Sequence, residues 1–114
     1  MAAGVATRIL DEDPTLREIV RRLADAYHPL RIYLFGSMAR VSAGPESDYD
    51  LLIVVRDDAP LELQQSGLAH QRLWGIRKPT DVLVCTEAWL RSREKVVTSL
   101  PATIIREGKL LYGA

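Results

Sequence analysis

Two aspartates separated by one residue stand at the start of a strongly apolar run. Asp48 and Asp50 flank Tyr49, and the chain then continues as LLIVV. Because side chains at i and i+2 of a β-strand lie on the same face, the two carboxylates are predicted to lie side by side, with Tyr49 facing away. Two like charges so close raise one pKa or require a cation between them, and hard oxygen ligands suit Mg²⁺ or Mn²⁺. The pair is therefore a candidate metal site.

A third aspartate, Asp81, opens the apolar run DVLVC in the same way that Asp50 opens its own run. If the two strands are neighbours, three carboxylates converge at one end of a sheet. Such a set can hold two divalent ions, the arrangement that clamps the attacking and leaving oxygens in phosphoryl or nucleotidyl transfer. The candidate catalytic and metal-binding residues are thus Asp48, Asp50 and Asp81.

A Gly-Ser pair, Gly36 and Ser37, is separated from Asp48 by the ten residues 38–47 and is a candidate phosphate-binding turn. Gly36 has no side chain, so its backbone can approach a phosphate closely. The MARV segment after Ser37 is predicted to form a helical turn, whose free N–H groups and dipole favour an anion. Ser37 and Arg40 could donate hydrogen bonds to phosphate oxygens. Either motif alone is more often a turn or a helix cap, but their spacing favours a nucleotide site.

Hydrophobic periodicity predicts the elements that must position these residues. Apolar residues at helical spacing over 16–27 indicate an amphipathic helix, with Asp13 and Pro14 as its N-cap and first turn and His28 at its end. Strands are predicted at 31–35 and 50–55, and the second is apolar on both faces, which favours a central position in its sheet.

The second half of the chain is predicted to alternate in the same way. The segment 61–76 has a helical pattern with a weak point at Gly67, and a third strand begins at Asp81. From Thr86 the pattern predicts one or two short helices that break before Pro101, followed by a short extended piece, KLLY, after Gly108. The order of elements predicts a mixed α/β (α+β) fold, with helices packed on one sheet.

Composition limits the remaining possibilities. The chain has 114 residues, fifteen basic and fifteen acidic side chains, and one cysteine. This length predicts one domain over 1–114, with no second domain to hold a substrate. Without a long apolar run or a basic leader we expect no membrane association and a cytoplasmic location, and the balanced charge predicts no direct nucleic-acid binding.

Cys85 is interpreted as a buried hydrophobe, and Trp74 and Trp89 are placed in the core rather than on a partner-facing surface.

The segments GSMAR, SDYDLLIVV and DVLV together resemble the nucleotidyltransferase superfamily of the DNA polymerase beta type. In particular they are similar to the minimal nucleotidyltransferases that are often paired with a helical HEPN protein. The resemblance covers essentially the whole chain and implies a polymerase beta palm-like fold. It also implies that Gly36 and Ser37 hold the nucleotide phosphates, that Asp48 and Asp50 ligate two Mg²⁺ ions, and that Asp81 is the third carboxylate.

The same resemblance implies a reaction and a partner. The reaction is transfer of a nucleoside monophosphate, AMP from ATP, to a hydroxyl on a HEPN ribonuclease toxin, which makes this chain the antitoxin of a hetero-oligomeric toxin–antitoxin pair. Two alternatives stay open from the sequence. The chain could be a catalytically weak module that blocks the toxin by contact alone, or it could transfer a nucleotide to a small-molecule hydroxyl.

Overall fold

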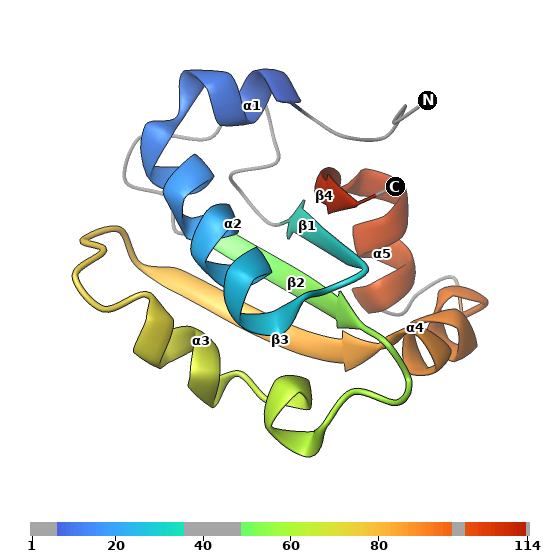
Figure 1. The fold of residues 1–114 in the computed structure, drawn as a ribbon. Helices are drawn as coiled ribbons and strands as arrows, with labels where there is room; N and C mark the ends of the chain where they lie inside the picture. The colour runs from blue at the N-terminus through green and yellow to red at the C-terminus, as the bar shows by residue number, and fades with distance from the viewer. Residues whose placement is uncertain (1–6, 36–48, 97–99, 114) are drawn as a thin grey trace.

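The computed structural model describes residues 7–35, 49–96 and 100–113 of the chain. A four-stranded sheet forms the middle layer, and helices lie against both of its faces (Figure 1). The elements in chain order are α1 (Thr7–Glu12), α2 (Pro14–Tyr27), β1 (Arg31–Phe35), β2 (Tyr49–Val55), the 3₁₀ helix η2 (Leu61–Gln64), α3 (Gly67–Arg72), β3 (Thr80–Thr86), α4 (Glu87–Glu94), α5 (Leu100–Glu107) and β4 (Lys109–Gly113). This arrangement confirms the predicted mixed α/β fold.

The sheet has the strand order β3-β2-β1-β4. β2 pairs with β1 in the antiparallel direction and with β3 in the parallel direction, and β4 pairs antiparallel with β1. β2 is therefore an inner strand, as its apolar character on both faces predicts. β3 is an outer strand of the sheet, and among the strands of 7–35, 49–96 and 100–113 it pairs only with β2.

Apolar side chains form two clusters, one on each face of the sheet. The larger cluster lies beneath α2 and α3, and the smaller one lies beneath α4 and α5. Successive residues of β2 alternate between them: Tyr49, Leu51, Ile53 and Val55 belong to the larger cluster, and Leu52 and Val54 to the smaller. This alternation follows from the two-residue repeat of a strand.

α2 begins and ends where the sequence predicts. The Asp13 side chain accepts a hydrogen bond from the Leu16 backbone N–H at 3.1 Å, and Pro14 occupies the first turn. The helix ends at His28, which takes the left-handed conformation (φ 46°) and donates its backbone N–H to the Ala24 carbonyl. The apolar face of the helix is buried, which confirms the amphipathic interpretation.

Three features differ from the predicted elements. The helix α1 ahead of α2 is absent from the prediction. The segment 61–76 is divided into η2 and α3, with Gly67 as the first residue of α3, because glycine weakens a helix interior. The last helix begins at Leu100 and contains Pro101 in its first turn, where a missing N–H costs nothing. Gly108 follows it, and a Cβ there would lie 2.6 Å from the Ile104 carbonyl oxygen.

The placement of both tryptophans in the core is wrong. Trp74 is 86% exposed and Trp89 is 44% exposed. Trp74 lies in the turn after α3 rather than on a buried helix face, so its side chain has no layer to pack under. In the three described ranges, no helix has the length and apolar character needed to cross a membrane.

Cys85 is buried on β3, as predicted, and burial raises the pKa of its thiol to about 11. Because only the thiolate reacts, we expect iodoacetamide to modify the native protein at pH 8 more than about 100-fold more slowly than the urea-unfolded chain, where the thiol pKa is about 8.5. The native rate should rise about tenfold per pH unit between pH 7 and 10. A native rate that levels off near pH 8.5 would contradict this assignment.

Candidate active site

The parallel pairing of β2 with β3 places Asp50 directly opposite Asp81. Neighbouring strands lie about 4.8 Å apart, so the two residues occupy adjacent positions at the end of the sheet where both strands begin. Both share the sheet face of Leu52 and Cys85, since residues two apart on a strand face the same way. Asp50 is half-buried and Asp81 is exposed, so the pair opens to solvent. Two of the three predicted carboxylates are thus brought together.

The other predicted site residues, Gly36, Ser37, Arg40 and Asp48, lie outside the described residues, together with the predicted helical turn after Ser37. Their roles stay predictions. Within 7–35, 49–96 and 100–113, no group of three or more His, Cys, Asp or Glu side chains is close enough to hold a metal ion. The donor set at Asp50 and Asp81 consists of hard carboxylate oxygens, which fits Mg²⁺ or Mn²⁺ rather than a softer metal.

Phe35 borders the aspartate pair on the side away from β3. It is the last residue of β1, it pairs with Asp50 across the sheet, and it packs against the smaller apolar cluster. Among the described residues, the aspartates therefore have a partly apolar neighbour on one side and the outer edge of the sheet on the other.

Tyr49 faces away from the aspartate pair, as the strand alternation predicts, and ties the start of β2 to the start of α2. Its hydroxyl donates a hydrogen bond to Asp13 Oδ2 at 2.5 Å, while Asp13 Oδ1 accepts from the Leu16 backbone N–H. Burial, followed by this contact with a carboxylate, raises the pKa of the Tyr49 hydroxyl well above its usual range, so the group remains a donor. Asp13 thus caps a helix and anchors the strand that carries Asp50.

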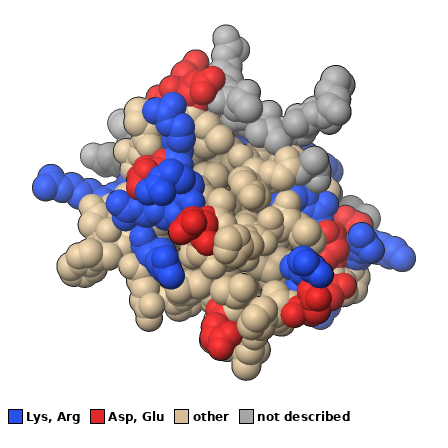
Figure 2. Space-filling model, in the orientation of Figure 1, with Lys and Arg blue, Asp and Glu red and all other residues tan. Residues whose placement is uncertain are grey.

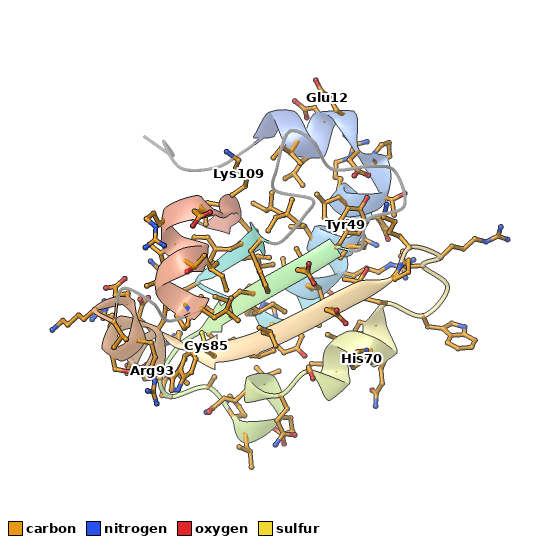
Figure 3. The ribbon with its side chains drawn as sticks, turned by 180° about the vertical axis from the view of Figure 1, so that it is seen from behind. Glu12, Tyr49, His70, Cys85, Arg93 and Lys109 are labelled. Atoms are coloured by element: carbon orange, nitrogen blue, oxygen red, sulfur yellow. The ribbon has the colours of Figure 1, made fainter. Side chains whose placement is uncertain are left out.

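The loop between α3 and β3 lies at the same end of the sheet, where it leads directly into Thr80 and Asp81 (Figure 1). Its Lys78 Nζ lies 5.1 Å from the centre of the Tyr49 ring. Figure 3 views the sheet from behind and shows Tyr49 at this end and Cys85 at the other, near α4. Its sequence, RLWGIRKPT, combines a tryptophan with several cations immediately before the third strand, and this composition is the signal that could have marked the loop as functional.

The nucleotidyltransferase domain family matches residues 14–110 of this chain. The match extends from α2 to β4 and includes both β2 and β3, the strands that carry the aspartate pair. The chain therefore belongs to the nucleotidyltransferase domain family. This membership confirms the superfamily that the sequence motifs resemble. A comparison with curated proteins found no significant match.

Solved structures share the fold. One is a toxin–antitoxin crystal structure with AMP-PNP, which is 24% identical with a TM-score of 0.59 over 86% of this chain and 73% of the other. Another is a nucleotidyltransferase-like protein from Sulfolobus solfataricus, 22% identical with a TM-score of 0.57 over 88% and 78% of the two chains. A third is a complex of a tri-AMPylated Shewanella oneidensis HEPN toxin with an MNT antitoxin, 23% identical with a TM-score of 0.52 over 88% and 71%.

The anchor of β2 can be tested by removing Asp13. The Asp13→Ala variant loses the cap of α2 and leaves the buried Tyr49 hydroxyl without its acceptor, so the free energy of unfolding should fall by about 1–3 kcal/mol. Urea denaturation followed by circular dichroism measures this change. Asp25→Ala removes an exposed carboxylate from the same helix and should change stability by less than about 0.5 kcal/mol. Equal effects of the two substitutions would contradict the anchoring role.

Proposed function

We propose that this chain is a metal-dependent nucleotidyltransferase that transfers AMP from ATP to a hydroxyl group on a partner protein. The observation that supports this most is the register that sets Asp50 opposite Asp81 in a chain of the nucleotidyltransferase domain family. The matching solved structures include one with AMP-PNP and one with an AMPylated toxin, which favours adenosine nucleotides and a protein acceptor.

In this proposal Asp48, Asp50 and Asp81 hold two Mg²⁺ ions, with Mn²⁺ as a substitute, while Gly36, Ser37 and Arg40 bind the triphosphate. When bound, such ions would supply Lewis acidity that lowers the pKa of the acceptor hydroxyl and would neutralise phosphate charge. Asp81 is exposed at the start of an outer strand, so it can also take or orient the acceptor proton.

The reaction is an in-line displacement at the α-phosphorus. The acceptor oxygen forms a bond to this phosphorus, the bond to the oxygen that bridges to the β-phosphate breaks, and pyrophosphate leaves with the electron pair. The acceptor proton passes to the Asp81 carboxylate. Positioning and charge neutralisation provide most of the rate, because phosphoryl transfer needs little covalent chemistry from the protein.

We also propose that residues 1–114 form a single domain and that another chain carries the acceptor. The family match alone occupies 14–110 and ends within β4. The proposed partner is a HEPN toxin, because solved structures with this fold include complexes of toxin and antitoxin. The modification neutralises the toxin, and the chain is its antitoxin. We place the pair in the cytoplasm, where nucleoside triphosphates are available.

The proposal is tested by incubating the chain with Mg²⁺, labelled ATP and the product of its neighbouring gene, which we expect to be a HEPN protein. We expect label on the HEPN protein, and chelation of the metal with EDTA should abolish the transfer. A stable complex without label would show inhibition by contact alone, and label only on a small-molecule hydroxyl would show a different acceptor. Either result would contradict protein modification.

The aspartate pair is tested by amide substitutions in the same assay. Asp50→Asn and Asp81→Asn should each lower the rate of transfer by at least about 100-fold, since each removes a charge that the reaction requires. Asp58→Asn changes an exposed carboxylate beyond the far end of β2 and should leave the rate unchanged. If the Asp81→Asn variant transfers AMP at a rate within a few-fold of wild type, Asp81 is not the third carboxylate of the site.

A further inference from the structure

A basic surface that includes an exposed tryptophan lies at the same end of the sheet as the candidate active site. It is formed by α2 and the turn and loop that follow α3, and we call it the Trp74 surface. Its members are Arg21, Arg22, Trp74, Arg77 and Lys78. We propose that the Trp74 surface docks an acidic segment of the partner protein that carries the acceptor hydroxyl; this inference rests on the function proposed above.

Hydrogen bonds hold the surface together. Arg22 Nη1 donates to the carbonyl oxygens of Arg72 at 3.3 Å and Trp74 at 3.0 Å, which ties the turn after α3 to α2. Trp74 is nevertheless 86% exposed, the largest exposed fraction among the large apolar side chains of the described residues. A large aromatic side chain on a fixed backbone is a typical anchor of a protein interface.

The positive charge of the surface is concentrated. Arg21 and Arg22 on α2 and Arg77 and Lys78 on the loop after Trp74 supply four cations, whereas the whole chain has a formal charge of zero. Two carboxylates of α2 lie near these cations: Asp25 interacts electrostatically with Arg21, and Glu18 accepts hydrogen bonds from Arg21 and Arg22 at 2.6–2.9 Å. These two guanidinium groups lower the pKa of Glu18 to about 2. Figure 2 shows Lys and Arg side chains gathered on the side of α2 and of the loop. The surface therefore favours an acidic partner.

An open hollow lies within this surface and can receive a side chain. Its volume is about 810 Å³, and it separates the start of α2 from the loop that leads into β3. Thr15 and Glu18 line it from the helix, and Ile76, Arg77 and Lys78 line it from the loop. Apolar and cationic groups on its walls fit a segment in which acidic and apolar residues alternate.

The position of the Trp74 surface links docking to chemistry. Arg77 is four residues before Asp81, so their Cα atoms are at most about 14 Å apart. Lys78 lies over Tyr49, whose neighbour in β2 is Asp50. The surface and the aspartate pair thus lie at the same end of the sheet but on opposite faces, because Tyr49 faces α2 while Asp50 and Asp81 face the side of α4 and α5. A partner seated here would reach the carboxylates with a segment that passes around this end of the sheet.

Charge and composition favour an acidic protein segment over two other occupants. Nucleic-acid-binding domains commonly have a pI above about 9 and stack successive bases on several aromatic side chains. This chain has a pI near 6.7, and Trp74 is the aromatic residue of its surface. In a symmetric pair of copies the same surface would face itself, and its cations would repel one another.

The test measures binding and transfer with the same HEPN protein and two sets of variants. Trp74→Ala and Arg77→Glu should each weaken binding, measured by calorimetry, by at least about tenfold. Their rate of transfer at saturating partner should stay within about twofold of wild type, so KM rises while kcat is kept. Trp89→Ala and Arg56→Glu, which change an exposed tryptophan and an exposed arginine near the far end of the sheet, should leave both constants unchanged. Circular dichroism confirms that each variant is folded.

The outcomes distinguish docking from the reaction. Wild-type affinity in Trp74→Ala and Arg77→Glu would overturn the docking surface even if AMP transfer persists. A complex that depends on these residues but carries no AMP would support docking and overturn the proposed reaction. Absence of any complex would overturn both. Tight binding of a twelve-nucleotide poly(U) RNA that Arg77→Glu abolishes, or a dimer of this chain that Trp74→Ala dissociates, would assign the surface to a different occupant and overturn the proposal.

Discussion

The parallel pairing of β2 with β3 is the constraint on which the rest of the site depends. Asp50 is the second residue of β2, and Asp81 is the second residue of β3. The register of the two strands places these two aspartates directly opposite each other. A slip of one residue would move one carboxylate to the opposite face of the sheet, beneath α2. The apolar residues Leu51 to Val55 of β2 are buried, and they pair with β3, of which Val82 and Cys85 are buried. This burial holds the register, so the apolar core positions the charged pair.

Alternate residues of β2 face opposite sides of the sheet, so the strand contributes both to the core under α2 and to the candidate site. Tyr49 reaches the α2 side and donates to Asp13, while Asp50, its neighbour, faces the side of α4 and α5. The carboxylate of Asp13 lies at the N-terminus of α2, where a negative charge is favoured. It also fixes the first residue of β2 through the hydrogen bond from Tyr49. The loop before β3 completes this end of the molecule and brings Lys78 over the Tyr49 ring.

Sequence patterns predict this fold well where periodicity is strong. The apolar stripe of α2, its Asp13 cap and the run after Asp50 follow from local rules of capping and strand alternation. The sequence predicts that Asp50 and Asp81 are adjacent only if their strands are neighbours in the sheet. The register between two strands depends on both segments, so the pattern of one segment cannot predict it. Trp74 was misplaced for a related reason: a large apolar residue predicts burial only if another layer covers it, and the turn after α3 has none.

The central claim is that Asp50 and Asp81 act in one site, and a double-mutant cycle on AMP transfer tests it most directly. Transfer rates of Asp50→Asn, Asp81→Asn and the double variant are compared with wild type under saturating Mg²⁺ and ATP. If both carboxylates serve the same step, the double variant should be little slower than the slower single variant. Losses that multiply would show that the two residues act independently and would contradict the shared site.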